Sequence, residues 1–215
     1  MNNSRPLFGG KPVMAFRSEL DRRAFLRGAG VVGVGATLAY QLKSDPTAFA
    51  QGSASDLEIL NYALTLEYLE ADFYRQGIEG GILEGRELEL LTPVGDHEQE
   101  HVVALTETVT SLGGTPVPSP MFTYPDDTFT DRTAFLTTAS TFEELGVTAY
   151  HGQVALIESV EILAAAAAIA GVESRHAAIL ADLLGGNPFP APFEASATMD
   201  EVLAAAMPFI AGGGQ

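Results

Sequence analysis

The 215-residue chain contains no cysteine. It can therefore form neither disulfides nor thiolate metal sites, and it has no cysteine nucleophile. Any transition-metal site must be built from carboxylate and imidazole groups, a donor set that suits iron, manganese or zinc. The length predicts one or two domains.

Positive charge is scarce after residue 50. The whole chain has a formal net charge of -17, and residues 51–215 contain only four arginines and no lysine, against 25 acidic residues. A surface this acidic repels the phosphates of nucleic acids and anionic lipids. We therefore expect neither of these to be a partner of the protein.

Most basic residues lie instead in residues 1–50, which have the layout of an export signal. Arg22 and Arg23 precede a weakly apolar run at 28–42, and an A-x-A cleavage pattern follows at 48–50. The adjacent arginines, followed by Ala-Phe-Leu, resemble a twin-arginine signal, so we predict export to the periplasm, cell envelope or extracellular space. The alternative is an uncleaved anchor. The run is short for a bilayer span, so no stable membrane span is expected after cleavage.

The rest of the chain has the pattern of an all-α protein, because no segment has a convincing period of two. Apolar periodicity, capping residues and glycines predict four long helices and a short one, at about 56–76, 93–112, 131–154, 159–184 and 200–207. The first helix is expected to end at Gly77. The second is expected to begin at Pro93, with Thr92 as its N-cap.

The long connection at 113–130 is rich in Pro, Gly, Thr and Asp and shows no helical pattern. A connection of this length can carry the chain from one end of a bundle to the other. We therefore predict a four-helix bundle over residues 51–190, with a crossover between its second and third helices. Residues 191–215 are expected to form a C-terminal tail that packs on the bundle.

Glutamates occupy the predicted inward face of each long helix, near its middle. They are Glu67, Glu98, Glu143 and Glu173. A buried, unpaired carboxylate costs several kcal/mol, so each must meet a cation or a hydrogen-bond donor. Four arginines are too few to neutralise these glutamates in addition to the acidic surface. A pair of divalent cations among the carboxylates would solve the problem.

The two halves of the bundle repeat one chemical pattern. In the first half, a glutamate is followed seven residues later by a tyrosine and then by Glu-x-x-His: Glu67, Tyr74, Glu98 and His101. The second half repeats this with Glu143, Tyr150, Glu173 and His176. Both spacings place the side chains on one helix face. The tyrosines are expected either to hydrogen-bond a ligating carboxylate or to pack as core aromatics.

One glutamate from each of two helices, plus Glu-x-x-His from each of two others, is the ligand set of ferritin-like di-metal carboxylate proteins. Segments 64–74, 142–150 and 173–178 also resemble the bacterial ferritin-like family related to plant desiccation-associated proteins. The resemblance covers about residues 55–210 and implies a ferritin-like bundle with two iron or manganese ions. The metal ligands that it implies are Glu67, Glu98, His101, Glu143, Glu173 and His176, with Glu98 and Glu173 bridging.

Two ions held by carboxylate and imidazole ligands suit redox chemistry of an oxidase, peroxidase or catalase type, with O2 or peroxide as the small oxidant, and the resemblance supports such an enzyme and a non-enzymatic protein equally. The resemblance identifies no individual catalytic residue. Iron storage is a weaker interpretation, because nothing in the sequence indicates cage contacts, although a homo-oligomer is possible. The alternative is a non-enzymatic exported protein that protects against desiccation or another envelope stress and uses its metal structurally.

The tyrosine seven residues later also decides which of two nearby glutamates is the predicted ligand. It favours Glu67 over Glu70 and Glu143 over Glu144. Glu144 is expected to face outward or to lie beside a ligand. Only the favoured members have a tyrosine seven residues later.

A competing motif is present, because residues 97–101 read H-E-x-x-H, the zinc-protease signature. In that interpretation His97 and His101 bind zinc and Glu98 is the general base. However, the counterpart of His97 in the second half is Val172, and the protease interpretation explains none of the other predicted ligands. We expect His97 and His151 to be solvated or to lie beside the ligands.

Overall fold

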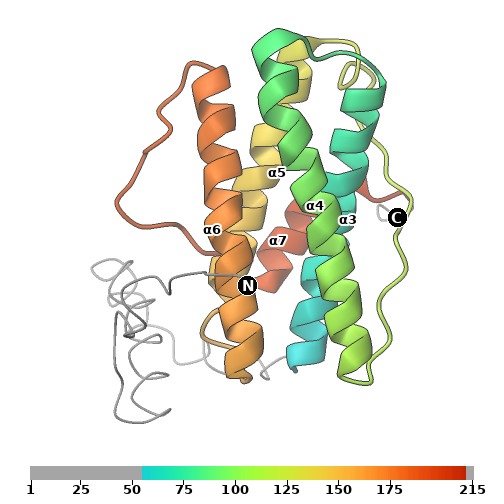
Figure 1. Cartoon of the computed structure of the whole chain (residues 1–215), viewed down its shortest axis with the longest axis vertical. Coiled ribbons are helices and arrows are strands. Elements are labelled where there is room, and N and C mark those ends of the chain that lie inside the picture. Colours follow the sequence, from blue (N-terminus) through green and yellow to red (C-terminus); the bar gives the residue numbers. More distant parts are fainter. Residues whose placement is uncertain (1–54, 212–215) are drawn as a thin grey trace, which may run out of the picture.

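The computed structural model describes residues 55–211, whose four long helices lie side by side (Figure 1). These helices are α3 (Asp56–Glu79), α4 (Gly85–Ser111), α5 (Arg132–Gln153) and α6 (Val160–Leu183). A short helix, α7 (Met199–Ala206), and a 3-10 turn, η3 (Met207–Phe209), follow. The architecture confirms the predicted all-α four-helix bundle. The predicted export signal in residues 1–50 lies outside the described residues.

The helices form two antiparallel pairs. α3 packs along α4, α5 packs along α6, and the pairs meet mainly through α3 and α5. The connection from α4 to α5 runs the length of the bundle, so the predicted crossover is confirmed (Figure 1). α6 is long and apolar enough to cross a membrane by length and composition. Here it packs on α5, with its inward face in the bundle core.

The C-terminal segment is tied to this crossover and to α5. The Thr123 N–H donates to the Phe209 carbonyl at 2.9 Å, and the Ala211 N–H donates to the Met121 carbonyl at 2.8 Å. α7 packs against α5. The crossover and the chain end therefore hold each other against the outside of the bundle.

Side-chain caps set most of the helix starts. Ser55 and Glu58 form a capping box at α3, in which the Ser55 N–H donates to the Glu58 carboxylate at 2.6 Å. The side chains of Asp131 and Ser159 accept from the first turns of α5 and α6. Thr198 starts α7 with a second capping box, which confirms the short helix predicted there.

The predicted end of the first helix is wrong. α3 continues through Gly77 to Glu79. A Cβ at Gly77 would lie 2.1 Å from Cε2 of Phe135 on α5, so the glycine allows close packing of the two helices and does not end α3. The chain turns only at Gly80 and Gly81, where Gly81 takes a φ of 70°.

The predicted start of the second helix is also wrong. α4 begins at Gly85, so Pro93 lies inside the helix and Thr92 is not its cap. The Thr92 hydroxyl donates instead to the Leu88 carbonyl at 2.7 Å. Proline removes one backbone hydrogen bond from a helix interior, and the packing of α4 along α3 offsets that loss.

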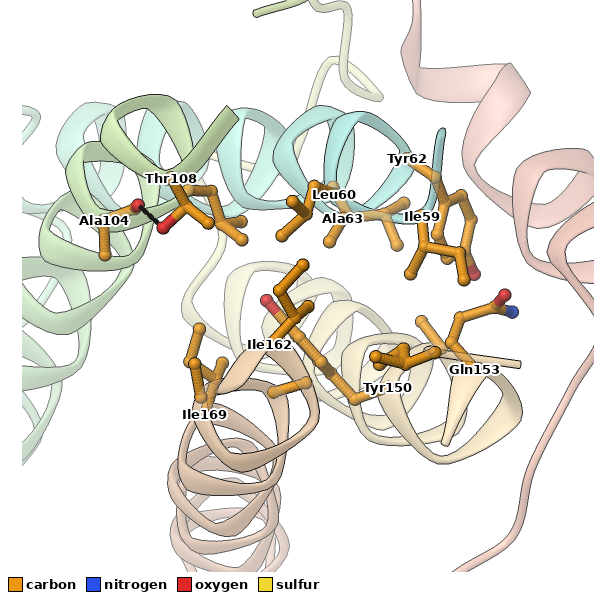
Figure 2. Close-up of a pocket in the computed structure, with 16 residues that line it drawn as sticks. Ile59, Leu60, Tyr62, Ala63, Ala104, Thr108, Tyr150, Gln153, Ile162 and Ile169 are labelled. Carbon is orange, nitrogen blue, oxygen red and sulfur yellow. Dashed lines mark hydrogen bonds between the residues drawn. The ribbon is translucent and has the colours of Figure 1, made fainter. Parts of the chain in front are cut away.

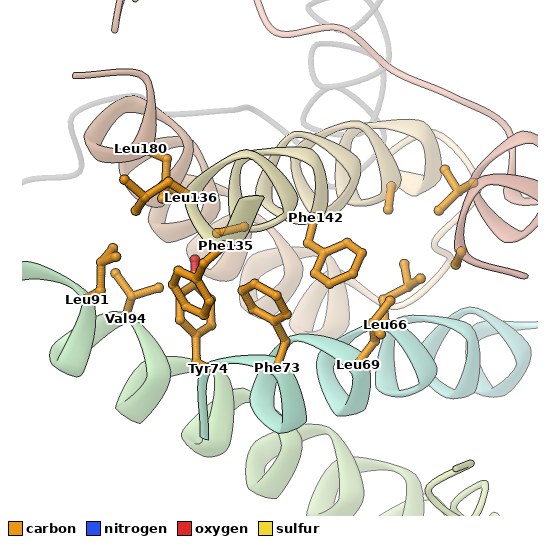
Figure 3. Close-up of a cluster of buried hydrophobic side chains, with 14 of the residues drawn as sticks. Leu66, Leu69, Phe73, Tyr74, Leu91, Val94, Phe135, Leu136, Phe142 and Leu180 are labelled. Carbon is orange, nitrogen blue, oxygen red and sulfur yellow. The ribbon is translucent and has the colours of Figure 1, made fainter. Parts of the chain in front are cut away.

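Two apolar clusters fill the bundle on either side of its middle. One is aromatic: Phe73 stacks on Phe135 with ring centroids 4.6 Å apart and meets Phe142 edge-on at 5.1 Å (Figure 3). The other, toward the start of α3 and the end of α4, is mostly aliphatic and includes Ile59, Leu60, Leu64, Leu105 and Ile162. On α4 and α6 the predicted glutamates Glu98 and Glu173 lie between members of the two clusters, and all four predicted glutamates are buried.

Candidate metal centre

All six predicted ligands converge at the middle of the bundle. Their side-chain donor atoms form two groups, in each of which the atoms lie within 4.8 Å of one another. One group is Glu67, Glu98, His101 and Glu173, and the other is Glu98, Glu143, Glu173 and His176. Glu98 and Glu173 belong to both groups. The arrangement can therefore hold two ions with two shared carboxylates.

Each long helix contributes donors from buried positions, and only His101, whose side chain is 12% exposed, is half-buried. The four glutamates are between 0% and 1% exposed, and His176 is 4% exposed. The Glu-x-x-His spacing on α4 brings Nδ1 of His101 to 2.9 Å from the Glu98 carboxylate. The same nitrogen lies 3.1 Å from Glu67 on α3 and 3.3 Å from Glu173 on α6.

Several of these buried donor atoms lack a hydrogen-bond partner among the described residues. They include Nδ1 of His176 and both carboxylate oxygens of Glu173. Nδ1 of His176 lies 2.8 Å from Glu98 Oε1 and 3.2 Å from Glu143 Oε2, but neither pair is aligned as a hydrogen bond. Close, unpaired oxygen and nitrogen atoms that face one another are what a metal ion would satisfy. The carboxylate and imidazole donors fit iron, manganese or zinc.

No described arginine compensates this negative charge. Arg75, Arg86 and Arg132 pair with acidic residues at the protein surface, and Arg175 is exposed on α6. Burial raises the pKa of Glu173 to about 8, with a further contribution from the neighbouring Glu98 charge. Burial also raises the pKa of Glu67 well above its usual range. Without a metal, protons must therefore neutralise part of the cluster.

The imidazoles of His101 and His176 hold some of the protons that neutralise the cluster. Burial lowers the pKa of His101, but the carboxylates of Glu173, Glu67 and Glu98 outweigh burial and raise it to about 12. Glu143 and Glu98 likewise outweigh burial at His176 and raise its pKa to about 10. At neutral pH both rings are therefore cationic, with a proton on each nitrogen. A metal ion would displace the proton from the nitrogen that it binds, so metal binding must release protons.

Each tyrosine hydroxyl hydrogen-bonds a predicted ligand of the opposite half. The Tyr74 hydroxyl on α3 donates to Glu143 on α5 at 2.6 Å. The Tyr150 hydroxyl on α5 donates to Glu67 on α3. Both rings also belong to the apolar clusters, so the two expectations for them hold together. Each hydroxyl fixes one carboxylate orientation and links the halves of the bundle.

Sequence reasoning missed a fifth buried carboxylate, Glu70. Its side chain is 3% exposed. A Cβ at Gly146 would lie 3.2 Å from Glu70 Oε1 and 2.7 Å from Glu173 Oε2, so Glu70 adjoins the cluster. Burial, followed by the charge of Glu173, raises the pKa of Glu70 well above its usual range.

A signal for Glu70 was present in the sequence. Along the repeat that relates Glu67 to Glu143, Glu70 corresponds to Gly146. A glycine opposite a glutamate, on the buried face of a facing helix, leaves room for the carboxylate. The tyrosine criterion identified Glu67 as a member of the cluster but gave no information about burial of Glu70.

The other candidate residues lie at the edge of the site or outside it. Glu144 is exposed, as expected. His97 is an exposed residue whose Nδ1 lies 3.0 Å from Nε2 of His176, so it contacts a predicted ligand and belongs to neither donor group. His151 contacts the Val147 carbonyl at 2.8 Å. The H-E-x-x-H motif therefore does not gather its histidines around one ion.

Comparison with known protein families supports this geometry. The sequence model of the ferritin-like domain matches residues 55–186. This range contains the four long helices and all six predicted ligands. A search of curated proteins finds no significant match to the chain.

Proposed function

Because the chain belongs to the ferritin-like domain family, we propose that its buried cluster binds two iron or manganese ions for redox chemistry on O2 or peroxide. The observation that carries this proposal is the pair of four-residue groups that share Glu98 and Glu173. Such sharing favours two neighbouring ions over one isolated ion.

The residues divide naturally between two ions. Glu67 and His101 would hold one ion, Glu143 and His176 would hold the other, and the shared carboxylates would bridge them. Tyr74 and Tyr150 would keep the terminal carboxylates oriented through their hydrogen bonds. The list of proposed ligands is that predicted from the sequence: Glu67, Glu98, His101, Glu143, Glu173 and His176.

When bound, two such ions supply the ability to exchange two electrons with an oxygen species. The protein contributes a dry site, because apolar clusters close the bundle above and below the carboxylates. Glu70 adds a further carboxyl group beside Glu173.

Metal analysis of the purified protein tests the proposal. The chain is reloaded with Fe(II) or Mn(II), freed of excess metal, and measured by elemental analysis. We expect about two ions per chain. Fewer than about one ion would overturn the proposal. An exposed-site variant, Glu144→Ala, serves as the control and should keep both ions, since Glu144 lies outside the cluster.

Turnover assays on the loaded protein then separate the two functional interpretations. Consumption of O2 or peroxide supports an oxidase, peroxidase or catalase-type enzyme. A strong rise in melting temperature on loading, without turnover of either oxidant, would support a structural metal in a stress-protective protein.

Export through the twin-arginine pathway completes the proposal and rests on the sequence of residues 1–50. Twin-arginine recognition requires the paired arginines, so replacing Arg22 and Arg23 with lysine should retain the protein in the cytoplasm. Mass spectrometry of the exported chain should show whether it begins near Gln51.

A further inference from the structure

A second feature, a partly open apolar cavity, lies beside the candidate metal centre. Its volume is about 60 Å3, and its walls come from all four long helices (Figure 2). Ile59, Leu60 and Ala63 on α3 face Ile162, Ala166 and Ile169 on α6. Nearly all the lining is hydrocarbon. The cavity occupies the end of the bundle that contains the aliphatic cluster.

Two buried polar atoms on the cavity lining lack partners. The Tyr62 hydroxyl and Oε1 of Gln153 form no hydrogen bond among the described residues, and their side chains are 6% and 3% exposed. Figure 2 shows the two groups at the same end of the cavity, facing one another. One is a hydroxyl that can donate, and the other is an amide oxygen that accepts. Burying both without a partner is costly, so a bound molecule would satisfy them.

The chemistry of the lining selects a class of ligand. A hydroxyl group can accept from Tyr62 and donate to Gln153 at once. The rest of the cavity suits an alkyl chain. Since one water needs roughly 10–15 Å3, the volume accommodates about four to six non-hydrogen atoms. We propose that this cavity binds a short, unbranched aliphatic alcohol, with its hydroxyl between Tyr62 and Gln153.

The cavity is connected to the candidate metal centre through one side chain. Tyr150 lines the cavity, and its hydroxyl donates to Glu67. An alkyl chain lying along the Tyr150 ring is therefore one side chain away from a proposed ligand. The idea that the cavity presents the alcohol to the metal centre rests on the proposed function. The binding of the alcohol to the cavity does not.

Methyl NMR of the metal-free full chain, labelled at isoleucine and titrated with 1-butanol, tests the binding. Ile59, Ile157, Ile162 and Ile169 line the cavity. Their methyl signals should shift and saturate together. The isoleucines of the opposite cluster, Ile78, Ile82 and Ile179, are the internal control and should not move. Absence of saturable shifts, as for a cavity that holds only water, would overturn the proposal.

Two pairs of variants locate the alcohol. Tyr62→Phe keeps the ring and removes the hydroxyl, so it should weaken 1-butanol about fivefold while leaving n-pentane binding unchanged. Equal effects on both ligands would contradict the assigned hydroxyl position. Ala166→Leu adds bulk to the lining and should weaken 1-butanol at least fivefold. Ala164→Leu, at an exposed position outside the lining, should have no effect.

The two proposals can fail separately. Saturable butanol shifts in a chain that fails to bind iron or manganese would leave the cavity assignment standing and remove the metal centre. Metal binding without butanol shifts would leave the metal centre standing and remove the cavity assignment. If both stand, adding 1-butanol to the loaded protein should alter its metal absorption spectrum through Tyr150 and Glu67, and Tyr62→Phe should reduce that response.

Discussion

The two halves of the bundle, α3–α4 and α5–α6, present the same ligand types but different surroundings. Glu70 in the first half corresponds to Gly146 in the second, and its carboxylate lies beside that glycine. His97 in the first half corresponds to Val172, and it contacts His176 across the bundle. The repeat therefore provides a symmetric donor set, while these two positions make the environments of the proposed ions unequal.

The largest effect is expected where the halves share a residue. Glu98 belongs to both donor groups, whereas Glu67 belongs to one. Glu98→Ala should reduce bound iron or manganese from about two ions per chain to well below one, while Glu67→Ala should leave about one. Elemental analysis after reloading measures both. Equal losses in the two variants would show that the groups do not act as two sites.

Alkaline pH should strongly destabilise the metal-free protein. The raised pKa values of Glu173 (about 8), His176 (about 10) and His101 (about 12) mean that the folded state binds more protons than the unfolded state above pH 5. Stability is therefore present at mildly acidic pH and is lost as the pH rises. Between pH 6 and pH 9 the melting temperature should fall by on the order of 10 °C.

The metal-loaded protein is the control for this pH effect, since the cations replace the protons and its decline should be smaller. Histidine NMR on the metal-free protein can also compare the halves. His176 should lose its proton before His101, because His101 lies near three carboxylates and His176 near two. The opposite order would contradict this account of the electrostatics.

Adding one methyl group at Gly146 tests the space that Glu70 uses. Its Cβ would lie 2.7 Å from Glu173 Oε2, whereas a Cβ at Gly171 would meet nothing within 4 Å. Gly171→Ala should raise the free energy of unfolding by about 0.5–1 kcal/mol, the usual gain in a helix. Gly146→Ala should lose this gain and weaken metal binding. Thermal unfolding and metal titration of the two variants make the comparison.

Removing the acidity of Glu70 tests the asymmetry directly. Glu70→Gln keeps the shape but not the charge, and we expect about tenfold weaker binding of Mn(II), as for other groups that adjoin metal ligands. Calorimetric titration measures the affinity. Glu144→Gln is the matched control on an exposed carboxylate and should leave the affinity unchanged. An unchanged affinity in both variants would limit Glu70 to a structural role.

The smallest effect is expected at His97. Its contact is with the outer nitrogen of His176, so His97→Ala should retain both ions and weaken binding by at most about tenfold. A zinc-protease type of site would instead lose its metal entirely. Elemental analysis of the variant decides between them, and His151→Ala is the control, because His151 contacts the Val147 carbonyl and belongs to neither donor group.

The repeat and the helix periodicity were sufficient to predict the four helices and the convergence of the six donor side chains. Spacings of three and seven residues place side chains on one face wherever the helix begins, so errors at Gly77 and Pro93 did not affect the site. Those boundary errors had a tertiary cause. Gly77 packs against Phe135, and α4 extends before Pro93, where it packs along α3.

Local spacing thus determined which side chains share a helix face, because helix geometry depends only on neighbouring residues. Tertiary structure alone decided which faces meet. It paired Tyr74 with Glu143 and Tyr150 with Glu67, placed Glu70 beside Gly146, and formed a cavity whose lining includes Tyr62 and Gln153. These contacts join residues on different helices, and their distances depend on how the helices pack rather than on their separation along the chain.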